Sequence, residues 1–473
     1  MGIWSQASEI AAATPEERNR YVDFLRAVSI LFVITGHWLI TTAEWDAASE
    51  TLRPLLALES VPWTAWLTWL FQVMPIFFIV GGYSNAISLE SARDKQLSYA
   101  QWLTGRLHRL LTPLLLLVLV WAVVSLLMQL AGAAESTIRF VSRTALVPTW
   151  FLAIYTMIVL LAPASYALWR RWGFASLAAY VLLAIFVDVA FFQLEITVFG
   201  WSNYFWVWLA MHHLGFAWRD GRIGSSLFLL GLAAASFAIF VSLIGFGPYP
   251  IAMAGSPGEE VSNTLPPKIT LIALGVTQFG LLLALEKPMQ RFLTGLRAWT
   301  CTVIINTMIM TIYLWHMTIL LLVLAVAWMA DGFGMGMAPG SVEWWWTRPV
   351  WLGLLTVLLV PCALLLSQLE RAGRPKNAPV PSALRLVVGA TMAGLGISLA
   401  TLLGFDGELL SLTNTGTLAL VIVGAWICGI SLRKVRRLSP DYHRPHSRNS
   451  AIRNSAGNFS SNTARPCFSS RGK

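Results

Sequence analysis

Two ionisable residues lie eleven positions apart inside the first long apolar stretch of the chain. They are Arg26 and His37, and the residues between them are almost all apolar. An ionisable side chain at membrane depth is costly and usually marks a functional position. Eleven residues of helix rise about 16 Å and make close to three turns, so both side chains project from nearly the same face. The spacing predicts one elongated polar pocket that could hold a long ligand.

His37 is the candidate for proton transfer. It stands in the segment Thr-Gly-His-Trp, where Gly36 lets another helix or a ligand approach closely. An imidazole titrates near neutral pH, so it can act as a general base toward a hydroxyl group. A membrane histidine can equally be a hydrogen-bonding group between helices, and the residue alone does not decide between these readings.

Arginines supply a candidate anion site. Arg26 needs a partner, which is either the nearby Asp23 or a phosphate-bearing ligand. Arg106 and Arg109 are three residues apart near the start of the third apolar stretch, so they share one helix face. They could clamp an anion. Arginines at a helix end also reach toward lipid headgroups or simply flank a span, and this alternative remains open.

Further candidates are weaker. Gly81 and Gly82 could expose backbone beside a ligand, although helix packing explains them equally well. His316 lies within a late apolar stretch and could form a second polar wall. The sequence contains no Gly-x-Ser-x-Gly, His-Glu-x-x-His or Gly-x-x-x-x-Gly-Lys motif. The four cysteines show no metal-type spacing, so we expect neither a metal site nor disulfides.

Composition identifies the elements that must carry these residues. Of 473 residues, 56% are hydrophobic and 12% are charged, whereas soluble domains carry about 25% charged residues. We therefore predict an all-α fold, a polytopic bundle of about twelve transmembrane helices. The predicted spans are 22–42, 66–88, 107–131, 150–168, 174–192, 201–218, 224–245, 268–286, 302–328, 350–368, 383–404 and 413–432.

Lys and Arg occur in alternate connections, which predicts that both termini are cytoplasmic. The formal charge of +10 is then a topology signal, and we expect no nucleic-acid partner. Residues 1–20 would be a cytoplasmic segment. Residues 433–473 are basic and rich in Ser, Asn and Pro, which predicts a disordered cytoplasmic tail.

Several short motifs resemble, in order and spacing, those of the membrane-bound acyltransferase family 3. Asp23, Arg26 and His37 are similar to the family's first-helix pattern, and the third-helix arginine motif is matched by Arg106 and Arg109. The other similar segments are Phe77–Tyr83, which includes Gly81, Gly82 and Tyr83, the fourth-helix start at Trp150, and Tyr313–His316. Gly81 departs from the family's usual serine.

The resemblance implies an architecture and an activity. Residues 21–370 would form a ten-helix acyltransferase domain, and residues 371–432 would add two transmembrane helices. The activity would be O-acyltransfer, typically O-acetylation, from cytoplasmic acyl-CoA such as acetyl-CoA to a hydroxyl of a carbohydrate or lipid-linked cell-envelope acceptor. No tightly bound cofactor is implied. The location would be a bacterial inner membrane.

The resemblance and the expected placement of these residues together suggest their roles. His37 and Asp23 would be catalytic, with His37 as the base, and Arg26, Arg106 and Arg109 would bind the acyl-CoA. An acyl-histidine intermediate is an alternative mechanism. The rival function is a transporter or flippase of a lipid-linked or anionic solute, because buried charges in many helices also suit alternating access. The sequence leaves open whether the protein forms a homo-oligomer.

Overall fold

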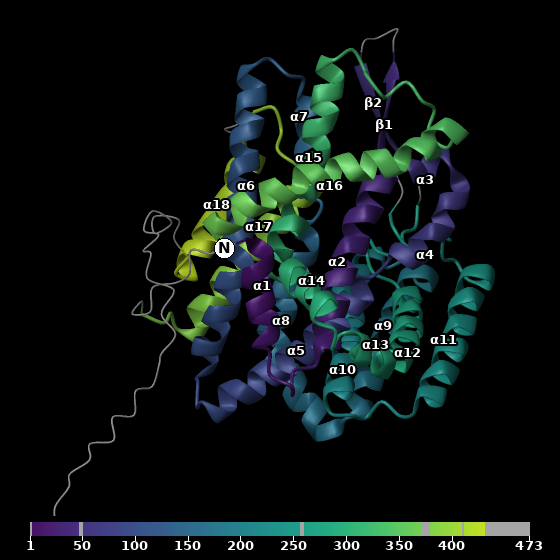
Figure 1. Cartoon of the computed structure of the whole chain (residues 1–473), viewed down its shortest axis with the longest axis vertical. Coiled ribbons are helices and arrows are strands. Elements are labelled where there is room, and N and C mark those ends of the chain that lie inside the picture. The colour runs from purple at the N-terminus through teal and green to yellow at the C-terminus, as the bar shows by residue number, and fades with distance from the viewer. Residues whose placement is uncertain (1, 47–50, 256–259, 371–378, 409–410, 431–473) are drawn as a thin grey trace, which may run out of the picture.

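The computed structural model describes residues 2–46, 51–255, 260–370, 379–408 and 411–430. The predicted disordered tail at 433–473 lies outside these residues. Nearly all of the described chain is helical, which confirms the all-α prediction (Figure 1). The helices of the first half are α1 Ile3–Ala12, α2 Arg20–Ile40, α3 Ala57–Ser60, α4 Thr68–Phe71, α5 Met74–Asp94, α6 Tyr99–Leu130, α7 Glu135–Leu146, α8 Thr149–Trp172 and α9 Phe174–Gln193. The second half contains α10 Asn203–Arg219, α11 Ser226–Phe246, α12 Ile269–Ala284, α13 Glu286–Phe292, α14 Leu296–Thr307, α15 Ile309–Met329, α16 Val342–Glu370, α17 Ala383–Leu403 and α18 Leu412–Ile427.

Within the described ranges, nine helices are long and apolar enough to cross a membrane, and the bent pair α12 and α13 makes a tenth if it is one span. Every predicted span overlaps a helix, but α10 and α18 have only 17 and 16 residues. One prediction was wrong in detail. The expected single helix 302–328 is broken at Met308, so that α14 and α15 are separate helices. The side chain of Asn306, just before the break, donates to the backbone oxygens of Asp23 and Thr302.

A β-hairpin that was not predicted follows α2. Strands β1 Thr41–Asp46 and β2 Thr51–Leu56 pair in antiparallel fashion directly after α2, with Glu44 opposite Arg53. The hairpin marks one end of the bundle (Figure 1), which we call the hairpin end. The opposite end, where α2 begins at Arg20, is called the arginine end. Two 3-10 helices complete the list, η1 Pro62–Leu67 and η2 Thr197–Ser202.

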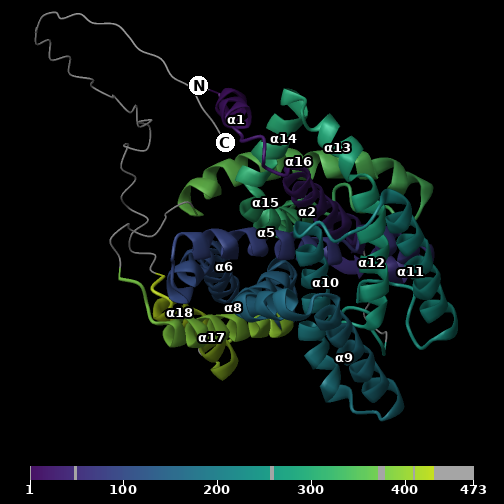
Figure 2. The same cartoon turned by 90° about the horizontal axis from the view of Figure 1, so that it is seen from below.

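Helix α2 lies in the interior of the bundle and packs on α5, α14 and α15. Its first turn is capped by Asn19, whose side-chain oxygen accepts from the backbone N–H of Tyr21. Buried residues of α2 and its neighbours form one large apolar core, which includes Phe78, Trp208 and Leu314. Figure 2 shows α2 among these helices and the long α16 crossing one side of the bundle.

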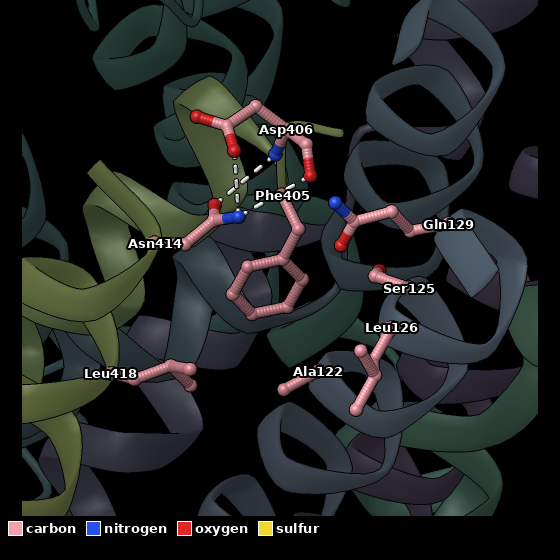
Figure 3. Close-up of a pocket in the computed structure, with 8 residues that line it drawn as sticks. All are labelled: Ala122, Ser125, Leu126, Gln129, Phe405, Asp406, Asn414 and Leu418. Atoms are coloured by element: carbon pink, nitrogen blue, oxygen red, sulfur yellow. Dashed lines mark hydrogen bonds between the residues drawn. The ribbon is translucent and has the colours of Figure 1, made fainter. Parts of the chain in front are cut away.

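The last two helices are tied to the rest of the bundle through α6, α7 and α8. Figure 3 shows the contact with α6, where a pocket is lined by Ser125 and Gln129 on one side and by Phe405 and Asp406 on the other. The side-chain nitrogen of Asn414 donates to the Asp406 carboxylate over 2.7 Å. The backbone N–H of Phe405 also donates to the Ser142 hydroxyl on α7 over 2.8 Å, so polar contacts hold the α17–α18 connection together and tie it to α7.

Candidate functional site

Helix α2 carries both Arg26 and His37, as predicted, and holds them at two depths of the bundle. Because the helix is continuous between them, their separation along its axis is about 16 Å. Arg26 lies toward the arginine end and His37 toward the hairpin end. The two positions belong to different clusters of polar side chains, which are described in turn.

Arg26 is held by an ion pair and a hydrogen bond. Its Nη1 donates to Asp23 Oδ1 over 2.8 Å, and its Nη2 donates to the hydroxyl of Ser84 on α5 over 2.8 Å. The Asp23 carboxylate is buried and also accepts from Arg18 Nε at 2.7 Å. Of the two partners considered for Arg26, the structure therefore supplies Asp23. One carboxylate faces two guanidinium groups, so the cluster keeps a net positive charge.

Arg106 extends this positive region. It lies close enough to Arg26 and Arg109 to interact with both electrostatically, and its guanidinium sits 5.7 Å from the centre of the Trp102 ring. Neither Arg106 nor Arg109 forms an ion pair with any carboxylate in the described ranges. The structure thus places Arg106 near both Arg26 and Arg109, and in the part of the chain that the structure describes neither Arg106 nor Arg109 has a carboxylate partner.

The second cluster joins α2 to α15. His37 Nδ1 lies 2.9 Å from His316 Nε2, and His316 Nδ1 lies 2.6 Å from the backbone oxygen of Tyr313. The indole N–H of Trp38 donates to the backbone oxygen of His316 over 3.1 Å. His316 is fully buried, whereas His37 is partly exposed. The accessible member of the pair is therefore His37, with His316 behind it.

The glycine pair of α5 serves two different contacts. A Cβ on Gly82 would lie 2.0 Å from the backbone oxygen of His212, so this glycine permits the close crossing of α5 and α10. A Cβ on Gly81 would lie 2.8 Å from the ring of Tyr155, and Tyr155 lies near Arg106. Gly81 therefore makes room for a tyrosine beside the arginine cluster.

Tyr83 lies near the arginine cluster, close to Asn19 and Asp23. The Tyr83 ring packs 4.7 Å from that of Trp218 on α10. Trp150, at the start of α8, is near Tyr204, with ring centres 6.4 Å apart. Its neighbour Pro148 accepts a 2.7 Å hydrogen bond from the hydroxyl of Tyr313, which places Trp150 near the His316 helix.

Three contributors to these clusters were not predicted: Arg18, Ser84 and Tyr155. Tyr313 was named only as part of the Tyr313–His316 segment. Only Tyr313 carried a local signal, because it precedes His316 by three residues and so lies one helical turn away. Ser84 and Tyr155 meet the arginines through long-range packing. In the described part of the chain, no group of three or more His, Cys, Asp and Glu side chains is arranged to hold a metal ion.

A further buried polar cluster lies elsewhere and has a structural explanation. Asp188 on α9 accepts from Asn203 Nδ2 at 2.9 Å, from the Tyr249 hydroxyl at 3.0 Å and from the backbone N–H of Ile269 at 2.9 Å. Burial and the adjacent Asp188 carboxylate raise the pKa of Tyr249, so its hydroxyl remains a donor. These bonds join α9 to the start of α10, to the α11–α12 connection and to the start of α12.

Membrane-length helices that enclose a cationic cluster and a histidine pair define a multi-pass membrane protein with an internal polar site. A comparison with family models identifies the family: the model described as the acyltransferase domain of acyltransferase family 3 matches residues 19–368. The protein therefore belongs to this family and is a membrane acyltransferase. No curated protein and no solved structure matches the chain.

Proposed function

We propose that the protein transfers an acyl group, typically acetyl, from acyl-CoA to a hydroxyl of a carbohydrate or lipid-linked cell-envelope acceptor. The observation that supports this most is the partly exposed His37, which shares one helix with Arg26 and is backed by a second histidine. A base at one depth and a cationic cluster at another suit a donor with a reactive thioester at one end and phosphates at the other.

The arginine end would bind the phosphates of acyl-CoA. Arg106 and Arg109 have donors to spare, because neither is paired with a carboxylate in the described ranges, and guanidinium groups bind phosphate through charge-assisted hydrogen bonds. Arg26 uses two of its nitrogens on Asp23 and Ser84, so it would add positive potential and orient the cluster. The pantetheine arm would then extend along α2 toward His37.

At His37 the chemistry would be general base catalysis. The imidazole takes the proton of the acceptor hydroxyl while the hydroxyl oxygen forms a bond to the thioester carbonyl carbon. The carbon–sulfur bond then breaks, and the thiolate of CoA leaves with the proton that His37 returns. In the alternative mechanism, His37 itself attacks the thioester and forms an acyl-histidine that the acceptor then cleaves.

The orientation follows from charge. Basic residues gather at the arginine end, where Arg219 pairs with Glu90 over 2.8 Å near the start of the α10–α11 connection. By the positive-inside rule this end, and both termini, would be cytoplasmic in a bacterial inner membrane. Acyl-CoA would then enter from the cytoplasm, and the acceptor would reach His37 from the hairpin end.

The test uses the full-length protein purified in detergent. Wild type should bind acetyl-CoA and release CoA slowly by hydrolysis. His37→Ala should keep binding and lose at least about 100-fold in the hydrolysis rate. Arg106→Gln should weaken acetyl-CoA binding about tenfold or more, which corresponds to about 1.4 kcal/mol. Acetyl-pantetheine, which lacks the phosphates of the nucleotide part, should bind wild type and Arg106→Gln equally.

The matched control is Arg385→Gln, which removes an exposed arginine from the first turn of α17. It should leave acetyl-CoA binding unchanged. Failure of folded wild type to bind acetyl-CoA or longer acyl-CoAs would overturn the proposal. Equal weakening by Arg385→Gln would show that only overall charge, and not the arginine cluster, attracts the donor.

A further inference from the structure

His316 occupies a position that only the fold reveals. It is 279 residues from His37 in sequence, yet two bonds connect it to consecutive residues of α2. Its ring meets the His37 ring, and its backbone oxygen accepts from Trp38. The two imidazole planes are inclined by only 18°, with centres 5.1 Å apart. The distance between the ring centres is longer than the 2.9 Å N···N distance by about the radii of the two rings. The two nitrogens therefore lie between the ring centres, and the rings meet edge to edge.

The hydrogen-bond partners determine where the protons lie. The backbone oxygen of Tyr313 can only accept, so His316 Nδ1 must carry a proton. In a neutral imidazole the other nitrogen is then bare, so His316 Nε2 accepts from His37 Nδ1. A neutral His37 that is protonated at Nδ1 has its lone pair on Nε2. These two hydrogen bonds therefore leave His37 Nε2, the basic nitrogen, without a contact to His316.

If the hydrogen bond ran the other way, from His316 Nε2 to His37 Nδ1, His316 would have to be charged, which is disfavoured. To donate from Nε2 to His37, His316 would need protons on both nitrogens. Its side chain is fully buried, and within the described ranges neither of its nitrogens contacts a carboxylate. An unpaired charge in such a site is strongly unfavourable. The neutral arrangement is the one that the surroundings support.

We propose that His316 is a positioning residue that fixes the tautomer of His37 and presents His37 Nε2 as the base. This inference rests on the proposed acyl transfer. When His37 takes the acceptor proton on Nε2, its Nδ1–H still donates to His316 Nε2, so the same bond stabilises the cation that forms. In a Ser-His-Asp triad the aspartate fixes the tautomer of the histidine. Here the neutral imidazole of His316 would have that role.

Two amide substitutions separate this role from packing. In His316→Gln the amide oxygen can reach about the place of Nε2 and accept from His37. In His316→Asn the shorter amide can bond the Tyr313 oxygen but cannot reach His37. We expect His316→Gln to keep the rate of CoA release within about tenfold of wild type and His316→Asn to lose on the order of 100-fold or more, with the KM for acetyl-CoA unchanged in both.

His212→Gln is the control, because His212 is also a fully buried membrane histidine but bonds to Asn85 on α5. It should match wild type in rate. Equal rates for His316→Gln and His316→Asn, after correction for the folded fraction, would overturn the proposal. If wild type itself binds no acyl-CoA and releases no CoA, the proposed function fails, and the tautomer is then judged by a second measurement.

That second measurement is nitrogen NMR of the full-length protein labelled with 15N-histidine, with His37→Ala used to assign the His37 signals. We expect His37 to be protonated at Nδ1 and bare at Nε2 in wild type and in His316→Gln. In His316→Asn this single tautomer should be lost. A His37 that is protonated at Nε2 in the wild-type protein would overturn the proposal whatever the activity shows.

Discussion

Replacing Gly215 by alanine should separate the helices α5 and α10. A Cβ at this position would lie 2.0 Å from the backbone oxygen of Ile79 and 2.6 Å from the backbone nitrogen of Tyr83. A carbon and an oxygen in contact are about 3.3 Å apart, so the two backbones must separate by about 1.3 Å. The obstructing atoms belong to the backbone, and no side-chain rotation can relieve the clash.

The loss of stability in Gly215→Ala depends on the side chains that are buried at the crossing of α5 and α10. Next to the two glycines, Phe78 stacks on Trp208 with ring centres 4.4 Å apart, and both side chains are fully buried. Overpacking usually costs about 1–3 kcal/mol, and a rigid backbone contact belongs at or above the upper end. The melting entropy of about 2.1 cal/mol/K per residue amounts to about 1 kcal/mol/K for a chain of 473 residues, so a loss of about 3 kcal/mol should lower the melting temperature by about 3 °C.

The assay is thermal unfolding in detergent at one fixed scan rate, followed by intrinsic tryptophan fluorescence. Gly231→Ala is the matched control, since Gly231 lies inside α11 and a Cβ there would meet no atom within 4 Å. This control should melt at or slightly above the wild-type temperature, because alanine favours helix. A Gly215→Ala protein that melts within about 1 °C of wild type would refute the close crossing.

Three further predictions address the polar clusters. Asp23→Asn should lower stability by about 1–3 kcal/mol, because it leaves Arg18 and Arg26 facing each other without their carboxylate; unfolding in detergent should show the loss, and added salt should reduce it. Tyr249→Phe should cost about 1–3 kcal/mol by removing one donor to Asp188, and it should leave the rate of CoA release unchanged below the melting transition. Trp38→Phe should lower the rate of CoA release a few-fold without changing the KM for acetyl-CoA, because it removes only the bond to the His316 backbone; an unchanged rate would show that the histidine bond alone holds the two helices in register.

The first membrane-length helix, α2, could be predicted in most of its detail. Its apolar length, the acidic residue in its first turn and the spacing of Arg26 and His37 are all local properties, and α2 is a continuous helix from Arg20 to Ile40. The same reasoning failed at Met308, because residues 302–328 contain no Gly, Pro or charged residue, and the break follows Asn306, whose side chain bonds the distant backbone of Asp23. Apolar pattern predicts that a helix exists and does not reveal where tertiary bonds interrupt it.

The contacts that the site residues make with other segments could not be predicted from the sequence, for a related reason. His316 could be named as a polar wall, but its bond to His37 depends on the register between α2 and α15. The hairpin β1–β2 was missed because its strands are short and follow a transmembrane helix, where a loop is the simplest expectation. In both cases the information lies in pairing between segments, which periodicity within one segment does not contain.

The packing of α5 against α10 affects the proposed donor-binding site at Arg26 more directly than the proposed base at His37. Gly82 sets how closely α5 approaches α10, and two residues later Ser84 accepts from Arg26. Arg26 and His37 are in turn fixed to each other by one unbroken helix. A change in the α5–α10 crossing would therefore shift Ser84 relative to Arg26 while leaving the His37–His316 bond to α15 in place. Acetyl-CoA binding and the tautomer of His37 would therefore respond separately. Gly215→Ala should weaken acetyl-CoA binding while His37 stays protonated at Nδ1.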